Sequence, residues 1–373
     1  MRLFVYGTLQ SAALCKAVSG GEVVSRTPAT LPDYTVLPVA KNVVPLIRKA
    51  VGRAATGLIL DGITEDQLTR LNAYEGAFGY DLIDVTVDTD DGPQSVQMYL
   101  PPDDIAVGDG SWSLDHWVQH YEGMAVLAAT ELFAHDPALS AVQIRASWHM
   151  IEHRAWVKWT AMQDNAPSTL RRTPRAGDVE VVRRAPPFGS FFRFQQFEVR
   201  HRQFDGAFSN VLQREVFAGS DAAIVLPYDP KRDRILLVEQ VRMGPILRQD
   251  PNPWMLEPIA GMVDARETPE QAAMRESIEE AKLMSLELRH LSSFYPSPGS
   301  STDYFHAYLG LCDLPDDHAT SGGLDSEAED LRLHLISYDR AMALVASGEI
   351  NTGPLVMMLS MLGAQRNALR NSA

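Results

Sequence analysis

The sequence predicts a mixed α/β protein in which two domains are joined by a helical segment. Short apolar runs between turn residues indicate strands in the first hundred or so positions and again after residue 178. Between them, apolar residues recur at helical spacing. With 373 residues and 45% hydrophobic content, the chain can form two modest cores. We therefore divide it into residues 1–108, a helical connector with a linker at 109–177, and residues 178–373.

Residues 1–108 predict a small α/β domain. Leu3-Phe4-Val5 is a short apolar run, as expected for a buried strand. Asp90-Asp91-Gly92 separates the apolar runs 85–88 and 96–99, and an Asp-Gly pair favours a tight hairpin turn. The sequence therefore predicts a β-hairpin near the end of this domain.

The connector predicts two amphipathic helices. Ser113 stands at an N-cap position, and Asp136-Pro137 separates two apolar stripes, so an antiparallel helix pair is expected. The stripes consist of Leu114, Trp117, Val118, Tyr121, Ala125, Ala128 and Leu132, and of Ile144, Trp148, Ile151, Ala155, Trp159 and Met162. Their tryptophans could form a ligand site, but the helical spacing favours core packing. Residues 165–177, rich in proline and arginine, predict a linker.

Residues 178–373 predict a mixed sheet covered by helices. Asp229-Pro230 and Asp233 mark a turn between two strands. Two helices are expected at 338–347 and 355–370. The expected strands are 179–182, 191–199, 222–226, 235–238, 291–294, 304–309 and 331–336. This order suits a sheet with helices on both faces.

The composition narrows the class of protein. A net charge of −15 argues against a general nucleic-acid binder, because phosphate contacts need a basic surface. Residues 145–202 hold eleven Lys or Arg against five Asp or Glu. This basic segment could bind RNA or an acidic partner, although charge compensation within an acidic chain is favoured.

Cys15 and Cys312 are too few for a disulfide framework. With no apolar run of ~18–20 residues and no secretory signal at the start, we expect a cytoplasmic enzyme without a membrane or nucleic-acid partner.

One acidic helix carries the strongest chemical signal. Residues 268–271 predict its start, with a threonine N-cap, a proline and a glutamine that completes a capping box. Glu276, Glu279 and Glu280 follow at i, i+3 and i+4, so like charges crowd one face. Mg²⁺ or Mn²⁺ would reverse this repulsion, because hard cations prefer carboxylate oxygens. The face expected to pack on a sheet carries Met274, Ile278 and Ala281.

Residues 261–283 resemble the Nudix box, G-x5-E-x7-R-E-U-x-E-E-x-G-U. Gly261, Glu267 and Arg275 fill its fixed positions, a combination that an acid-rich surface helix does not explain. Ser277 and Lys282 depart from the pattern at positions that are not metal ligands. The resemblance implies an α/β/α sandwich that hydrolyses a diphosphate, with Glu267 steadying the loop through Arg275.

Flanking segments resemble the ADP-ribose pyrophosphatase branch of that family. They are residues 214–217, 226–230, 238–242, 253–261, 297–299 together with Asp303, and 348–351. This resemblance implies Mg²⁺- or Mn²⁺-dependent hydrolysis of ADP-ribose to AMP and ribose 5-phosphate. It also implies a homodimer joined through the Nudix domain.

The resemblance assigns metal and catalytic roles to the box. Glu276, Glu280 and the Ala260 carbonyl would ligate the metal ions, which lower the pKa of a bound water. Glu279 would act in catalysis as a third carboxylate contact or as an orienting group, held by Arg275 four residues before it.

The flanks supply the remaining expected groups. Arg214, Arg242 and Glu257 match substrate-binding positions, and arginine suits bidentate phosphate contacts. Each could equally be structural. Asp303 stands in a Gly/Ser-rich loop where the branch places a catalytic base or metal contact, usually a glutamate. Its alternative role is that of a turn former.

The first domain resembles the γ-glutamyl cyclotransferases, which implies a small β-barrel with helices. The resemblance rests on residues 4–9, on residues 71–76 and on Tyr80. It implies that Glu75 shuttles a proton as an α-amine closes on a γ-amide, a role that needs a carboxyl of raised pKa. The expected substrate cradle is Tyr6, Gly7, Thr8 and Leu9. Gln10 stands where the family has a basic residue, so an inactive or regulatory domain is equally open.

Three rival functions remain at this stage. Cyclotransfer by the first domain could be the main activity. The Nudix part could hydrolyse other ADP-sugars or nucleoside diphosphates, because the box binds the diphosphate and not its ends. A non-catalytic ADP-ribose sensor is the third, and the intact carboxylates of Glu276, Glu279 and Glu280 argue against it.

Overall fold

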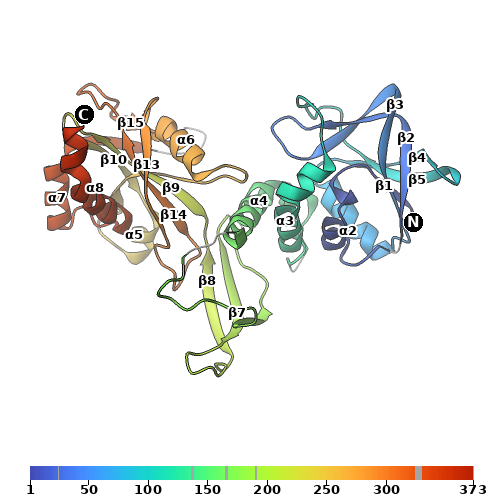
Figure 1. Cartoon of the computed structure of the whole chain (residues 1–373), viewed down its shortest axis with the longest axis horizontal. Coiled ribbons are helices and arrows are strands. Elements are labelled where there is room, and N and C mark those ends of the chain that lie inside the picture. The colour runs from blue at the N-terminus through green and yellow to red at the C-terminus, as the bar shows by residue number, and fades with distance from the viewer. Residues whose placement is uncertain (24, 136–137, 164–166, 190, 324–329, 373) are drawn as a thin grey trace. The chain divides into compact units, whose positions relative to one another are not determined.

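The computed structural model describes the chain except for residues 24, 136–137, 164–166, 190, 324–329 and 373. It divides into two compact units (Figure 1). The first comprises Met1–Phe191 and Gln196–Leu212, and the second Phe192–Gln195 and Gln213–Ala373. The mixed α/β class is confirmed. The three-part division proposed from the sequence stays a prediction, and the two connector helices lie in the first unit.

The first unit contains a closed five-stranded barrel with strand order β1-β3-β2-β4-β5. Its strands are β1 Leu3–Val5, β2 Ser25–Pro38, β3 Pro45–Asp61, β4 Asp81–Thr89 and β5 Gly92–Leu100. The predicted hairpin is β4–β5, with Thr89 opposite Gly92. The long strands β2 and β3 were not predicted, nor were the 3₁₀ turn η1 Thr8–Gln10 and the helices α1 Ala12–Ser19 and α2 Glu65–Gly76.

Strand β1 explains how this barrel separates two cores. Phe4 points to a cluster with Ile47, Ile59 and Met98, whereas its neighbours on either side pack with helix α1. Alternate residues of a strand face opposite sides, so the three residues of β1 contribute to both cores.

Helices α3 Leu114–Leu132 and α4 Ala141–Gln163 confirm the two helices predicted for the connector. The Ser113 hydroxyl accepts a hydrogen bond from the His116 amide, which confirms the predicted N-cap. Trp117 is buried in the cluster that contains β1 and α1, and Ile151 packs with Ala128 of α3. The predicted break at Asp136-Pro137 lies outside the described residues. The described residues 167–177 form neither helix nor strand.

A strand pair follows these helices. The antiparallel strands β6 Val179–Arg184 and β7 Arg193–His201 confirm two predicted strands. Strand β8 Leu212–Ala218 was not predicted. Three polar residues, 213–215, separate Leu212 from the apolar residues 216–218, so the strand lacks the alternation by which it could be recognised.

The second unit is built on an eight-stranded sheet with order β13-β14-β9-β10-β16-β15, where β11 pairs with β10 and β12 with β9. The strands are β9 Asp221–Asp229, β10 Arg234–Val241, β11 Trp254–Glu257, β12 Ile259–Met262, β13 Glu287–Phe294, β14 Tyr304–Leu311, β15 Ser321–Gly322 and β16 Leu331–Ser337. The helices are α5 Met243–Arg248, α6 Pro269–Ala281, α7 Tyr338–Ser347 and α8 Gly353–Asn371. Strand β9 pairs in parallel with β14.

Both faces of this sheet are covered, which confirms the α/β/α sandwich (Figure 1). On β9, Ile224 and Leu226 belong to the cluster with helices α7 and α8. Ala223 and Val225 belong to the cluster with α6. The strand is apolar on both faces because both are buried.

No helix in the described ranges is long and apolar enough to cross a bilayer. Cys15 and Cys312 are both free thiols, as the low cysteine count predicts.

Candidate functional site

Helix α6 begins as the sequence predicts. The Thr268 hydroxyl accepts from the Gln271 amide, and the Gln271 side chain accepts from the Thr268 amide, so the capping box is complete. The predicted packing face is confirmed at Ala281 but is wrong at Met274 and Ile278. Met274 and Ile278 are only partly buried, and the residues against the sheet are Ala272, Ala273, Ser277, Glu280 and Ala281. Small side chains allow the helix to approach the sheet closely, which brings its carboxylates to strand β12.

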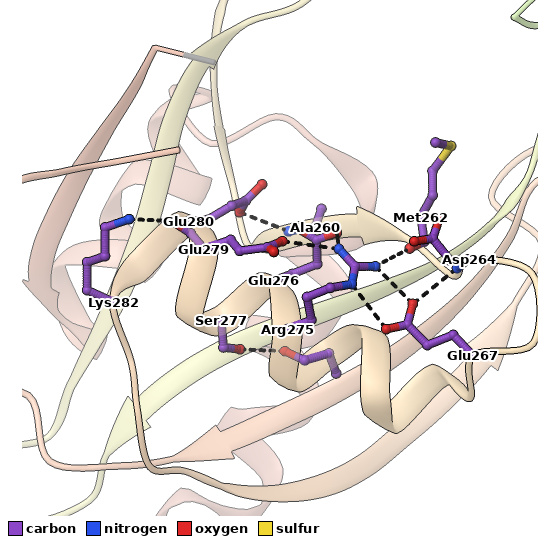
Figure 2. Close-up of polar contacts among 11 residues, drawn as sticks. Ala260, Met262, Asp264, Glu267, Arg275, Glu276, Ser277, Glu279, Glu280 and Lys282 are labelled. Carbon is purple, nitrogen blue, oxygen red and sulfur yellow. Dashed lines mark hydrogen bonds and ion pairs between the residues drawn. The ribbon is translucent and has the colours of Figure 1, made fainter. Parts of the chain in front are cut away.

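Arg275 is the centre of the carboxylate cluster (Figure 2). Its guanidinium donates to both oxygens of Glu267, at 3.1 and 2.9 Å. Its Nη1 donates to Glu276 at 2.5 Å and to Glu279 at 3.2 Å, and its Nη2 to the Met262 carbonyl at 2.9 Å. These contacts, the bond to Glu267 first, raise the pKa of Arg275. One fixed cation therefore orders three carboxylates, including the expected contacts to Glu267 and Glu279.

The loop before the helix is closed by Glu267. Its carboxylate also accepts from the Asp264 amide at 3.1 Å. Glu267 thus joins the loop to helix α6, although it is not itself a residue of the helix. This agrees with the expectation that it steadies the loop through Arg275.

Gly261 is required by a close approach. A Cβ placed there would lie 1.8 Å from Oε1 of Glu276. Any side chain at residue 261 therefore displaces the Glu276 carboxylate from strand β12. This contact gives a physical reason for the glycine that begins the box.

Glu280 is almost completely buried, at 1% exposure. Its Oε2 accepts from the Ala260 amide at 3.2 Å (Figure 2). The structure thus brings together Ala260 and Glu280, both expected at the metal site. A buried carboxylate is costly unless bonded, so its location beside strand β12 needs compensation.

The two departures from the box have structural explanations. Ser277 is fully buried, and its hydroxyl donates to the Ala273 carbonyl at 2.7 Å. Lys282 is the C-cap residue in the left-handed region, with φ 57°, where glycine is favoured. Its Nζ donates to the Glu279 carbonyl at 2.9 Å.

The donor types in this cluster fit a hard divalent cation. Carboxylates of Glu276, Glu279 and Glu280 lie on one helix beside the backbone of Ala260. Throughout the described part of the chain, no three acidic, histidine or cysteine side chains form a ready cation site. Arg275 occupies part of the space between Glu276 and Glu279, so cation binding requires these carboxylates to turn from their arginine contacts.

Asp303 lies at the same end of the sheet. It precedes Tyr304, which is opposite Asp221 at the start of β9, and β12 ends on the other side of β9. Two strand spacings, about 10 Å, therefore separate the strand that follows Asp303 from β12. The Asp303 carboxylate accepts from the Ser220 amide at 3.1 Å and from the Ser301 hydroxyl. Both oxygens are thus held by the protein.

The expected substrate-binding residues lie in three strands or turns. Arg242 caps α5, and its Nε donates to Glu257 at 2.7 Å, so these two are brought together. The Arg242 side chain remains 42% exposed and available to an anion. Arg214 of β8 is exposed, and its Nη1 donates to the Gln213 carbonyl at 2.7 Å.

The first unit contains a separate cavity of about 220 Å³. Tyr6, Gly7, Thr8, Leu9 and Glu75 all line it, so the structure brings these five predicted residues together. Burial raises the pKa of Glu75 from 4.5 to about 7. The carboxyl can therefore hold or release a proton near neutral pH, as the expected role requires.

Gly7 is explained by contact rather than by an unusual backbone. Its φ is −117°, and a Cβ there would lie 2.9 Å from Cγ of Pro45. The turn η1 follows, and its Gln10 amide donates to the Gly7 carbonyl at 3.0 Å. The Gln10 side chain donates to the Tyr6 carbonyl at 2.9 Å.

The cavity also contains Tyr80, named in the resemblance, and three residues that sequence reasoning missed, namely Tyr99, Trp148 and Glu152. Burial raises the pKa of Tyr6, Tyr80 and Tyr99, with the charge of Glu75 as a further cause for each. Trp148 and Glu152 of α4 also line the cavity. The tryptophan stripe was a usable signal for these two, although helical spacing pointed to packing alone.

Comparison with known families agrees with this geometry. Residues 219–355 match the NUDIX domain, and residues 3–114 match the family described as gamma-glutamyl cyclotransferase, AIG2-like. The chain belongs to the Nudix hydrolases, with an AIG2-like domain at its N-terminal end.

Individual relatives match about half of the chain. The ADP-ribose pyrophosphatase of Escherichia coli K12 is 36% identical over 210 residues, which cover 56% of this chain and 97% of the relative. That of Haemophilus influenzae is 34% identical over 197 residues, covering 52% and 90%. A GDP-mannose pyrophosphatase of Escherichia coli HS is 29% identical over 150 residues, covering 40% and 77%.

Proposed function

We propose that the second unit hydrolyses the diphosphate of ADP-ribose to AMP and ribose 5-phosphate with Mg²⁺ or Mn²⁺. The observation that carries this proposal is the carboxylate cluster ordered by Arg275. Glu276 and Glu280 meet strand β12 at Gly261 and Ala260, and Glu279 shares the same arginine. Two similar pyrophosphatases, each matched over at least 90% of its length, support the choice of ADP-ribose.

Each residue of the site has its own proposed role in the hydrolysis. Glu276, Glu280 and the Ala260 carbonyl would hold the metal ions, and Glu279 would orient or complete that set. Bound cations supply charge neutralisation and a water of lowered pKa. Arg242 would bind the substrate phosphates as it exchanges its contact with Glu257. Asp303 would take up a proton at its carboxylate once released from Ser301.

The test is product identity with the full chain. ADP-ribose plus Mg²⁺ should give AMP and ribose 5-phosphate in equal amounts, and EDTA should abolish the reaction. GDP-mannose in the same assay measures preference for the adenine nucleotide. Cleavage unaffected by EDTA would contradict the metal roles. Cleavage of GDP-mannose alone would contradict the proposed substrate.

A second candidate function is cyclotransfer in the first unit, favoured by Glu75 at the cavity with a pKa of about 7. In this reaction the α-amine nitrogen bonds to the γ-carbonyl carbon, and the γ C–N amide bond breaks. The proton lost by the α-amine passes through Glu75 to the departing amine. The products are a five-membered lactam and a free amine, and no water is consumed.

A homodimer joined through the Nudix unit and a cytoplasmic location remain parts of the proposal. Light scattering of the full chain tests the first, and fractionation of cells that express it tests the second.

A further inference from the structure

The cavity of the first unit is completed by helices beyond the AIG2-like domain. The family match ends at residue 114, where α3 begins. Helix α3 contributes Trp117, Met124 and Ala128 to the cavity wall, and α4 contributes Trp148 and Glu152. The part of the chain first interpreted as a connector therefore lines a ligand-sized space.

Trp148 is held against helix α2 and the segment after it by two aromatic contacts. Its ring centroid lies 5.8 Å from that of Tyr74 and 5.2 Å from that of Phe78, both edge to face. Glu152 follows four residues later, one helical turn along the same face of α4. The positions of Trp148 and Glu152 at the cavity are therefore coupled.

The lining of the cavity is acidic and aromatic. Its two charged residues are Glu75 and Glu152, and none of the described lining residues is Lys, Arg or His. Burial raises the pKa of Tyr74, and the charges of Glu75 and then Glu152 contribute further, so both carboxylates lie within electrostatic range of its hydroxyl. Aromatic faces with carboxylates attract a cation.

Two arginines outside the lining, Arg48 and Arg145, donate to backbone carbonyls. Burial raises the pKa of Tyr6 and Tyr80, and the charge of Arg48 offsets part of that rise, but the Arg48 Nη2 donates to the carbonyls of Pro102 and Ile105 at 2.8 and 3.2 Å. Arg145 of α4 donates from Nε to the Ala77 carbonyl at 2.8 Å. Neither lines the cavity, and the two charged residues of the described lining are both acidic.

We propose that this cavity accepts a small ligand with a primary ammonium group, and that Glu152, placed by Trp148, is the counter-ion that selects it. The cavity's ligand preference is thus set by a helix that does not belong to the AIG2-like domain. Where the cavity also performs the second candidate reaction, Glu75 serves the closing amine and Glu152 binds an ammonium group on the departing amine. These two roles in the reaction depend on cyclotransfer, whereas the binding of an ammonium group does not.

Calorimetry of the full chain with 1-aminopentane and 1-pentanol tests the proposal, because these molecules match in length and differ in charge. The amine should bind at least roughly tenfold more tightly than the alcohol. Glu152→Gln should remove most of this preference, and Glu152→Asp should restore part of it. Glu65→Gln, which removes an exposed charge of α2 outside the cavity, should leave it unchanged.

Equal binding of the two molecules, absence of binding, or full preference in a folded Glu152→Gln variant overturns the proposal. Circular dichroism identifies variants that fail to fold, and Glu152→Asp then decides whether the charge matters. A second arm measures lactam release from γ-glutamyl pentylamide and γ-glutamyl-1,5-diaminopentane. No release from either, with amine selectivity intact, refutes cyclotransfer and leaves the ammonium site standing. Release without a preference for the diamine removes Glu152 from recognition of the departing amine.

Discussion

The carboxylates of α6 and the carboxylates of the first-unit cavity are stabilised in opposite ways. In the second unit, Arg275 bonds to Glu276 and Glu279 of the helix and to Glu267 of the loop before it, and so keeps these carboxylates ordered. At the cavity, burial raises the pKa of Glu75 to about 7, and no basic side chain stands in the described lining. The first arrangement suits groups that must remain anionic for cations. The second suits an acid that gains and loses a proton.

The largest effect is expected from Glu280→Gln. This substitution keeps the shape of a buried side chain but removes a proposed metal ligand, so hydrolysis of ADP-ribose should fall roughly 10²–10³-fold or more. Steady-state release of AMP measures it, and circular dichroism checks the fold. Glu287→Gln on strand β13, exposed and paired with Arg289, is the matched control. Near-normal turnover would falsify the assigned role.

The substitution Glu75→Gln tests whether the cavity carboxyl holds a proton in the folded state, and the quantity measured is the free energy of unfolding. Because the folded-state pKa is raised from 4.5 to about 7, the native state binds the proton more tightly than the unfolded chain. Glu75 should therefore contribute stability that is fully present below pH 4.5 and lost as pH rises through 7. The change is at most about 3 kcal/mol.

Denaturant unfolding of the full chain at several pH values measures this contribution. The difference in the free energy of unfolding between Glu75→Gln and the unsubstituted chain should vary between pH 4.5 and 7. A pH-independent difference contradicts the raised pKa.

Gly261→Ala separates the geometry of the carboxylate cluster from its charge. The new methyl would lie 1.8 Å from Glu276 Oε1, so that carboxylate must turn from Arg275. Hydrolysis should fall roughly tenfold to a hundredfold, because a small displacement disturbs positioning. Gly244→Ala on α5, where a Cβ meets nothing within 4 Å, is the control. Equal activity of the two variants counts against the close approach.

The smallest effect concerns the end of helix α6. Lys282→Gly should raise the free energy of unfolding by roughly 0.5–1 kcal/mol, because Lys282 has φ 57°. Lys282→Ala loses the contact to the Glu279 carbonyl but keeps the backbone strain. If urea unfolding ranks the glycine variant below the alanine variant, the strain does not govern stability there.

The sequence predicted elements whose signal is local. The capping box of Thr268 and Gln271 and the hairpin turn before Gly92 depend on neighbours in the chain, and both are present. Strand β2 was missed because Pro28 and Pro32 interrupt an otherwise extended run, and proline usually argues against a central strand.

Tertiary packing decided what the sequence could not. The amphipathic pattern of α6 pointed to Met274 and Ile278, but the sheet accepts the smaller Ala272 and Ala273. The cavity role of Trp148 was likewise hidden, because periodicity places a side chain on a helix face and does not say whether that face is fully filled.

The burial of Trp117 determines where this protein can be divided. The indole, 2% exposed, belongs to the same apolar cluster as Leu3, Leu14 and Leu60, although it follows the end of the AIG2-like match at residue 114. A fragment cut at that limit would lack part of its own interior and expose apolar surface to water. Autonomous expression of the N-terminal portion should therefore retain the chain through Gln163, and shorter fragments should aggregate.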